Sequence, residues 1–139
     1  MFGGSIDRVY KLPKLSEYPL VYKWLKKEPG NAIAEFPMHS WGGGKATREE
    51  TLRMLYSLYH GKSLVNGYSG FNPPDYEIMV KLANSDFPSK EIDNRLINMG
   101  VDYIVVNGNM YDSNKLHSIK VWYQDKLVKE EDNYYVFHL

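Results

Sequence analysis

The segment from Ser57 to Tyr76, SLYHGKSLVNGYSGFNPPDY, concentrates side chains that could bind a polar ligand. It holds an imidazole at His60, an amide at Asn66 and a phenol at Tyr68, and apolar stretches flank it. These groups could form hydrogen bonds with a hydroxyl-rich ligand above an aromatic surface. Turn chemistry explains the same residues, because asparagine side chains and tyrosine hydroxyls often satisfy the backbone of a loop. The composition of the segment leaves both interpretations open.

Glu35 is the carboxylate that could complete such a site. It lies in the apolar run AIAEF, two residues before Pro37, near the expected end of a buried strand. Ligand sites of open α/β sheets gather at the carboxyl ends of strands. A carboxylate there could be desolvated and become a base, or it could accept hydrogen bonds from loop amides. We expect the next strand to end beside this one, so that Glu35, His60, Asn66 and Tyr68 form one substrate-binding rim.

Other motifs with possible chemistry are incomplete. The run HSWGGGKAT has His39 where a phosphate-binding loop requires glycine, and Ala46 where it requires serine or threonine. The four histidines include no pair spaced four residues apart, which disfavours a zinc site on one helix. Ser69 lacks the G-x-S-x-G arrangement of a nucleophilic serine, and the chain has no cysteine. The sequence therefore predicts no metal, no cofactor and no catalytic residue of these classes.

Strands that alternate with helices must position these residues. The pattern predicts an α/β fold, a three-layer single domain with a mixed, partly parallel sheet and a C-terminal antiparallel hairpin. Residues 1–15 are expected to form an extended arm and residues 16–139 the domain. Expected helices follow Ser16, Thr47, Pro73 and Ser89, with a last one around Leu116, Ile119 and Tyr123, and expected strands cover 32–36, 63–66, 101–108 and the hairpin of 127–139.

The second expected helix has a capping signal and an apolar face. Thr47 and Glu50 have the spacing of a capping box, which predicts a helix start at Thr47. Helical spacing then places four side chains on one face, which we expect to pack on the sheet: Leu52, Leu55, Tyr56 and Tyr59.

Bulk composition excludes several classes of function. The 139 residues are 43% hydrophobic and 24% charged, as in an ordinary globular protein. Seventeen basic residues balance seventeen acidic ones, which argues against nucleic-acid binding and against attraction to an anionic membrane. No apolar run approaches the roughly 20 residues that cross a bilayer, so the chain itself is expected to be soluble. Twelve tyrosines are the unusual feature, and tyrosine is favoured where a surface meets a partner.

The spacing of several of these residues resembles a known family. The landmarks are Glu-x-Pro at residues 35–37, Tyr-x-x-x-His-Gly at 56–61, Asn-Gly-Tyr-Ser-Gly at 66–70 and Gly-Val-x-Tyr-x-Val-Val at 100–106. The pattern resembles a C-terminal region of polytopic bacterial membrane proteins related to the GT-C glycosyltransferases, including dolichyl-phosphate-mannose-protein mannosyltransferase-like proteins. The resemblance extends over most of the chain, from Tyr18 to Val106.

The resemblance implies an accessory, non-catalytic domain on the extracytoplasmic face of the bacterial cell membrane. Its parent would move sugars from polyprenyl-phosphate donors, and its partners would be the membrane-spanning part of that parent and carbohydrate or a polyprenyl-linked sugar. The essential acidic residue of that family lies in an early loop between membrane helices, so no catalytic residue carries over to this chain.

Two alternatives remain open at this point. One is a small stand-alone hydrolase that uses Glu35 and His60 as an acid–base pair, which requires both side chains to reach a common reacting atom. The other is a protein-binding module, which requires an exposed aromatic patch of several hundred Å².

Overall fold

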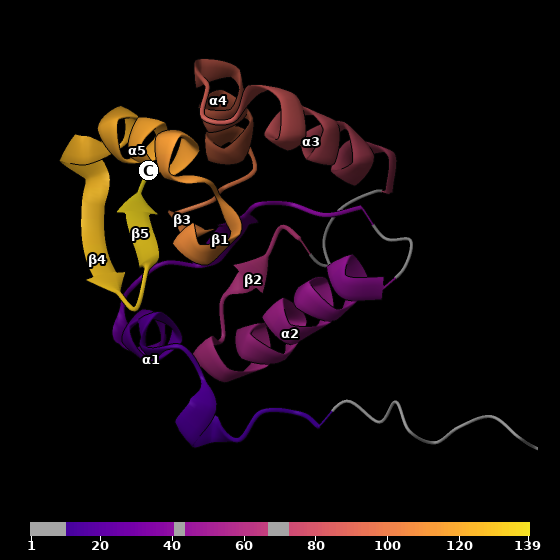
Figure 1. The fold of residues 1–139 in the computed structure, drawn as a ribbon, viewed down its shortest axis with the longest axis vertical. Coiled ribbons are helices and arrows are strands. Elements are labelled where there is room, and N and C mark those ends of the chain that lie inside the picture. Colours follow the sequence, from indigo (N-terminus) through magenta and orange to yellow (C-terminus); the bar gives the residue numbers. More distant parts are fainter. Residues whose placement is uncertain (1–10, 41–43, 67–72) are drawn as a thin grey trace, which may run out of the picture.

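In the computed structural model the chain alternates between helices and strands, as the sequence predicts (Figure 1). The structure describes residues 11–40, 44–66 and 73–139. The helices are α1 (Leu20–Lys27), α2 (Gly44–His60), α3 (Pro73–Asp86), α4 (Lys90–Asn98) and α5 (Ser113–Trp122). The strands are β1 (Ala32–Phe36), β2 (Ser63–Leu64), β3 (Tyr103–Asn107), β4 (Leu127–Glu131) and β5 (Tyr134–His138). Short 3-10 turns lie at Leu15–Glu17, Gly108–Met110 and Gln124–Lys126.

The five strands form one mixed sheet in the order β2-β1-β3-β5-β4. β1 pairs in parallel with both β2 and β3, whereas β5 is antiparallel to β3 and to β4. The hairpin turn places Asp132 and Asn133 at φ angles of 50° and 63°, the conformation of a tight turn that matches the twist of its strands. This arrangement confirms the predicted α/β fold with a partly parallel sheet and a C-terminal hairpin.

Helices cover both faces of the sheet and give the domain three layers (Figure 1). Because side chains of a strand alternate between faces, Ala34 and Phe36 pack with α3, α4 and α5, while Ile33 packs with α1 and α2. β3 divides in the same way, since Ile104 and Val106 join the first cluster and Val105 joins the second. Glu35 therefore points to the side of the sheet that α1 and α2 cover.

Two predicted helix starts are wrong, and local chemistry explains each. α1 begins at Leu20 and not after Ser16, because Tyr18 precedes a proline and is held in an extended conformation (φ −65°, ψ 136°). α2 begins at Gly44, so Thr47 lies inside the helix. The Glu50 carboxylate accepts hydrogen bonds from Arg53 and from the backbone of His39, outside the predicted capping box.

The inner face of α2 also differs from the prediction. Of the four predicted side chains, Tyr56 is buried, whereas Leu52, Leu55 and Tyr59 are only partly buried. The most buried positions along the described part of this helix are Glu50, Arg53, Tyr56 and His60. α2 thus turns a polar face, which carries charge, toward Glu35 on β1.

Candidate functional site

Glu35 is the centre of a buried polar cluster between β1, α1 and α2. Only 1% of the residue is exposed. The Tyr22 hydroxyl, from α1, donates a hydrogen bond to Glu35 Oε1, and Arg53 Nε, from α2, lies 4.0 Å from the same oxygen. Glu35 Oε2 is buried without a hydrogen-bond partner among the described residues. One carboxylate oxygen is therefore well supported and the other is not.

Arg53 ties α2 to the end of β1. Its Nη1 donates to Glu50 Oε1 at 2.7 Å and to the Pro37 carbonyl at 2.6 Å. Glu50 Oε1 also accepts from the backbone N–H of His39 at 3.2 Å. Both side chains of this ion pair are at most 5% exposed, so the pair is shielded from solvent. One guanidinium thus faces two buried carboxylates.

The proton affinities of the cluster follow from burial and from this imbalance of charge. Burial raises the pKa of Glu35 to about 7, although Arg53 and the hydrogen bond from Tyr22 act in the opposite direction. Burial also raises the pKa of Glu50, against the pull of Arg53. Burial and the neighbouring Glu35 raise the pKa of Tyr22 well above its ordinary value. Glu35 can therefore gain or lose a proton near neutral pH.

The structure joins Asn66 to Glu35 through the backbone. Asn66 Oδ1 accepts from the Glu35 N–H at 2.9 Å, and Asn66 Nδ2 donates to the Glu35 carbonyl at 2.8 Å. The amide side chain repeats the pattern of a paired strand residue just beyond β2. The strand ends are neighbours as predicted, and Asn66 serves there as a structural clamp.

His60 contacts Lys62 and Tyr22. Its Nδ1 accepts from the backbone N–H of Lys62 at 3.1 Å, and its ring stacks on the ring of Tyr22 with centroids 5.8 Å apart. Burial and the nearby Lys62 lower the pKa of His60 to about 4, so its ring is neutral at pH 7. His60 thus stacks on the ring of Tyr22, whereas Glu35 accepts a hydrogen bond from the Tyr22 hydroxyl. Tyr68, the fourth predicted residue, lies outside the described residues.

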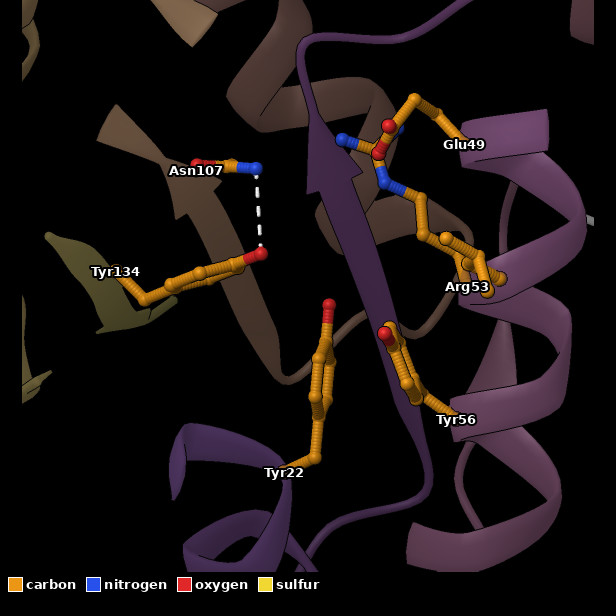
Figure 2. Close-up of a pocket in the computed structure, with 7 residues that line it drawn as sticks. Tyr22, Glu49, Arg53, Tyr56, Asn107 and Tyr134 are labelled. Atoms are coloured by element: carbon orange, nitrogen blue, oxygen red, sulfur yellow. Dashed lines mark hydrogen bonds between the residues drawn. The ribbon is translucent and has the colours of Figure 1, made fainter. Parts of the chain in front are cut away.

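A cavity of about 250 Å³ opens next to this cluster (Figure 2). In Figure 2 the hydroxyls of Tyr22 and Tyr134 point toward its middle from α1 and β5, and side chains of α2 line its other side. Asn107, at the end of β3, donates to the Tyr134 hydroxyl at 3.2 Å. The lining residues are Tyr22, Glu49, Leu52, Arg53, Tyr56, Asn107 and Tyr134.

The topology explains why a cavity forms at this place. From the end of β1 the chain passes into α2, and from the end of the neighbouring strand β3 it passes into α5. These connections cover opposite faces of the sheet. Connections that diverge from neighbouring strands leave a crevice at their carboxyl ends, where α/β proteins bind ligands. Asn107 ends β3 and Arg53 contacts the carbonyl just after β1, so the cavity lies at this crevice.

The three described residues of the predicted rim lie near the cavity, but none of them lines it. These residues, Glu35, His60 and Asn66, are buried. Tyr22 and Arg53 do line the cavity, and both contact Glu35. The sequence could have indicated Asn107 as a site residue, because it is a polar residue at the end of the clearest strand. It could also have indicated Arg53, which follows Glu50 by three residues on one helix. It held no signal for Tyr134, because only the pairing of β5 with β3 places that residue beside Asn107.

Several negative observations bear on function. Among the residues that the structure describes, no group of three or more histidine or acidic side chains could hold a metal ion. Within the same ranges, no helix has the length and apolar character that crossing a membrane requires. The large apolar side chains that are most exposed in the described ranges are aliphatic apart from Trp122.

Comparison with known proteins gives no relative. No protein-family model matches the chain, and no curated protein or solved structure is significantly similar to it. Function must therefore be inferred from the site itself.

Proposed function

We propose that this chain is an accessory, non-catalytic domain that binds a hydroxyl-rich group, such as one sugar unit, in the cavity between the ends of β1 and β3. The observation that carries the proposal is the lining of that cavity. Three tyrosines, an asparagine, a glutamate and an arginine surround about 250 Å³ at the crevice where α/β sheets place their ligands. Aromatic rings with a few directed polar groups are typical of small-molecule sites.

The hydrogen-bonding groups suit a ligand that both donates and accepts. The Tyr134 oxygen accepts from Asn107, which leaves the Tyr134 hydrogen to donate into the cavity. Tyr22 donates its hydrogen to Glu35, which leaves its oxygen to accept from a ligand. Glu49 adds an acceptor and Arg53 adds donors. A sugar hydroxyl can both donate to the acceptors and accept from the donors of the cavity, whereas an apolar ligand can do neither.

The size of the cavity favours a single ring. Sites for drug-sized ligands have volumes of roughly 300–1,000 Å³, and this cavity has about 250 Å³. One sugar unit is therefore a better fit than an oligosaccharide or a lipid chain.

Binding is favoured over a hydrolase reaction by the positions of Glu35 and His60. Neither residue lines the cavity. One oxygen of Glu35 is held by Tyr22, and Nδ1 of His60 is held by the backbone of Lys62. An acid–base pair must reach a common reacting atom, and these contacts direct the two groups to different parts of Tyr22.

The wider context of this proposal comes from the motif pattern of the sequence. In a GT-C-like parent on the extracytoplasmic face of a bacterial membrane, the domain would hold the sugar acceptor or the sugar of a polyprenyl-linked donor near the membrane-spanning part. Two motif residues, Glu35 and Pro37, contact the cavity-lining side chains of Tyr22 and Arg53, and Asn66 holds the backbone of Glu35. We therefore expect the motif residues to support the cavity.

Isothermal titration calorimetry with methyl α-D-mannopyranoside and methyl α-D-glucopyranoside tests the proposal. We expect saturable binding of at least one glycoside to the purified chain. Tyr134→Phe removes the donor that faces the cavity and should weaken binding about three- to tenfold, the effect of one hydrogen bond. Tyr59→Phe alters a tyrosine of α2 that does not line the cavity and serves as the matched control.

Two results would contradict the proposal. One is equal binding by the Tyr134→Phe and Tyr59→Phe variants, which would place the ligand elsewhere. The other is transfer of a sugar from a polyprenyl-phosphate donor by the isolated chain, which would make the domain catalytic.

A further inference from the structure

Tyr22 belongs to the cavity and to the buried charge cluster at the same time. Its hydroxyl lines the cavity and also donates to Glu35 Oε1. The Tyr22 hydroxyl can donate its hydrogen to only one acceptor at a time. Whether Glu35 is ionised therefore determines whether Tyr22 presents an acceptor or a donor to a ligand. Arg53 has the same double position, because it lines the cavity and lies 4.0 Å from Glu35.

The groups around Glu35 leave its charge incompletely balanced. Tyr22 faces it from α1, Arg53, Glu50 and Tyr56 act on it or respond to it from α2, and Tyr134 responds to it from β5. Arg53, the one cation of this group, is already hydrogen-bonded to Glu50. Glu35 Oε2 has no hydrogen-bond partner among the described residues. An ionised Glu35 is therefore poorly stabilised, and burial raises its pKa to about 7.

We propose that Glu35 is a proton-controlled switch that sets the direction of the Tyr22 hydrogen bond at the cavity wall and so makes ligand binding depend on pH. The dependence of ligand binding rests on the proposed function, whereas the Tyr22 switch stands on the contacts of Glu35 alone. When Glu35 is ionised, Tyr22 donates to it and presents an acceptor to the cavity. When a solvent proton binds to Glu35, the carboxyl group donates to the Tyr22 oxygen, and the Tyr22 hydrogen turns to the cavity as a donor.

The direction of the pH effect follows from solvation and charge. A ligand that fills the cavity removes water, and the loss of water destabilises an ionised carboxylate directly behind the wall. Protonation also reduces the number of carboxylates that compete for Arg53. We therefore expect a neutral glycoside to bind more tightly at pH 6 than at pH 8, with uptake of protons when it binds between these values.

Nuclear magnetic resonance of the unliganded protein tests the switch without any ligand. With ¹³C-labelled Glu and Tyr, the side-chain carboxyl carbon of Glu35 and the Cζ of Tyr22 should shift together, with a common midpoint near pH 7. Glu35→Gln should abolish the shift of Tyr22 in this range. Glu91→Gln, which removes an exposed carboxylate on α4, should leave it unchanged. Independent movement of the two signals, or no shift of Tyr22 between pH 5 and pH 9, would overturn the switch.

Calorimetry with methyl α-D-mannopyranoside at pH 6 and pH 8 tests the coupling to binding. We expect about threefold weaker binding at pH 8, the effect of one redirected hydrogen bond, and no such difference in Glu35→Gln. A pH dependence that persists in Glu35→Gln would overturn the coupling. If neither methyl α-D-mannopyranoside nor methyl α-D-glucopyranoside binds at either pH while Glu35 and Tyr22 titrate together, the sugar-binding function fails and the switch is supported.

Discussion

Arg53 is the residue on which the buried charges of this domain depend. It is 4% exposed, pairs with Glu50 at 2.7 Å and lies near Glu35. The sequence shows Glu50 and Arg53 three residues apart on a helix but cannot show that both face inward, since such pairs are usually solvated. Glu35 could be identified in advance, because a carboxylate within an apolar strand is exceptional. Its partner required the structure.

Replacing Arg53 by methionine should destabilise the fold strongly. The substitution keeps an unbranched apolar stem but removes the guanidinium, so Glu50 and Glu35 stay buried without a cation, which costs about 3–5 kcal/mol for a broken buried pair. Urea denaturation at pH 7 measures this loss. Arg95→Met is the matched control, because the Arg95–Glu91 pair is exposed and should contribute less than about 1 kcal/mol. Similar losses in the two variants would mean that the buried cluster does not stabilise the domain.

At the scale of elements, the order of strands and helices could be predicted, because apolar side chains recur with a different period in a strand and in a helix. Tyr76, Met79, Val80 and Ala83 are buried on α3 as helical spacing predicts, and Ser89 caps α4. The clamp that extends β2 could not be predicted, because β2 itself has only two residues, Ser63 and Leu64. Beyond β2 the Val65 N–H still donates to the Ile33 carbonyl, and the Asn66 side chain then pairs with the backbone of Glu35.

Asn66→Ala should therefore loosen the end of β1. It leaves the N–H and the carbonyl of Glu35 unpaired in a buried position, which costs about 2–3 kcal/mol in the free energy of unfolding. Hydrogen exchange should show faster exchange of the Glu35 amide. Asn114→Ala, at an exposed position of α5, is the control and should change stability by less than about 0.5 kcal/mol. Unchanged protection of the Glu35 amide in Asn66→Ala would contradict the clamp.

At the scale of the whole molecule, two buried groups give stability opposite dependences on pH. Glu35 has a pKa near 7 when folded and an ordinary value of 4.5, so the folded protein retains a proton that the unfolded chain loses. Its contribution to stability is full below pH 4.5 and is lost as the pH rises to 7. His60 has a folded pKa of about 4 and an ordinary value of 6.5, so its contribution is present above pH 6.5 and is lost as the pH falls to 4.

The Glu35→Gln variant should separate the contribution of Glu35 to the pH dependence of stability from that of His60. Without the Glu35 contribution, stability should rise more steeply with pH between 4.5 and 6.5 than in the unaltered protein. The difference between the two proteins should grow by on the order of 2–3 kcal/mol from pH 4 to pH 8, in favour of the variant. Urea denaturation across this range measures it. A constant difference would show that Glu35 does not keep its proton in the folded state.

The fold of the whole molecule could be predicted, but its cavity could not. The alternation of apolar strands and amphipathic helices is sufficient for a three-layer α/β domain. The cavity depends on contacts between residues far apart in the chain, such as Asn107 and Tyr134, which are 27 positions apart. A single sequence predicts that strands form more readily than it predicts which residues of different strands become neighbours.

We propose that a sugar occupies the cavity between the ends of β1 and β3, and this occupancy can be observed at the residues that line the cavity. The most direct measurement follows the side-chain amide of Asn107 by ¹⁵N nuclear magnetic resonance while methyl α-D-mannopyranoside is added at pH 6. We expect a saturable shift of this signal together with the ring signals of Tyr134 and Tyr22. A saturable response confined to residues outside the cavity, or no response at any residue, would contradict the proposal.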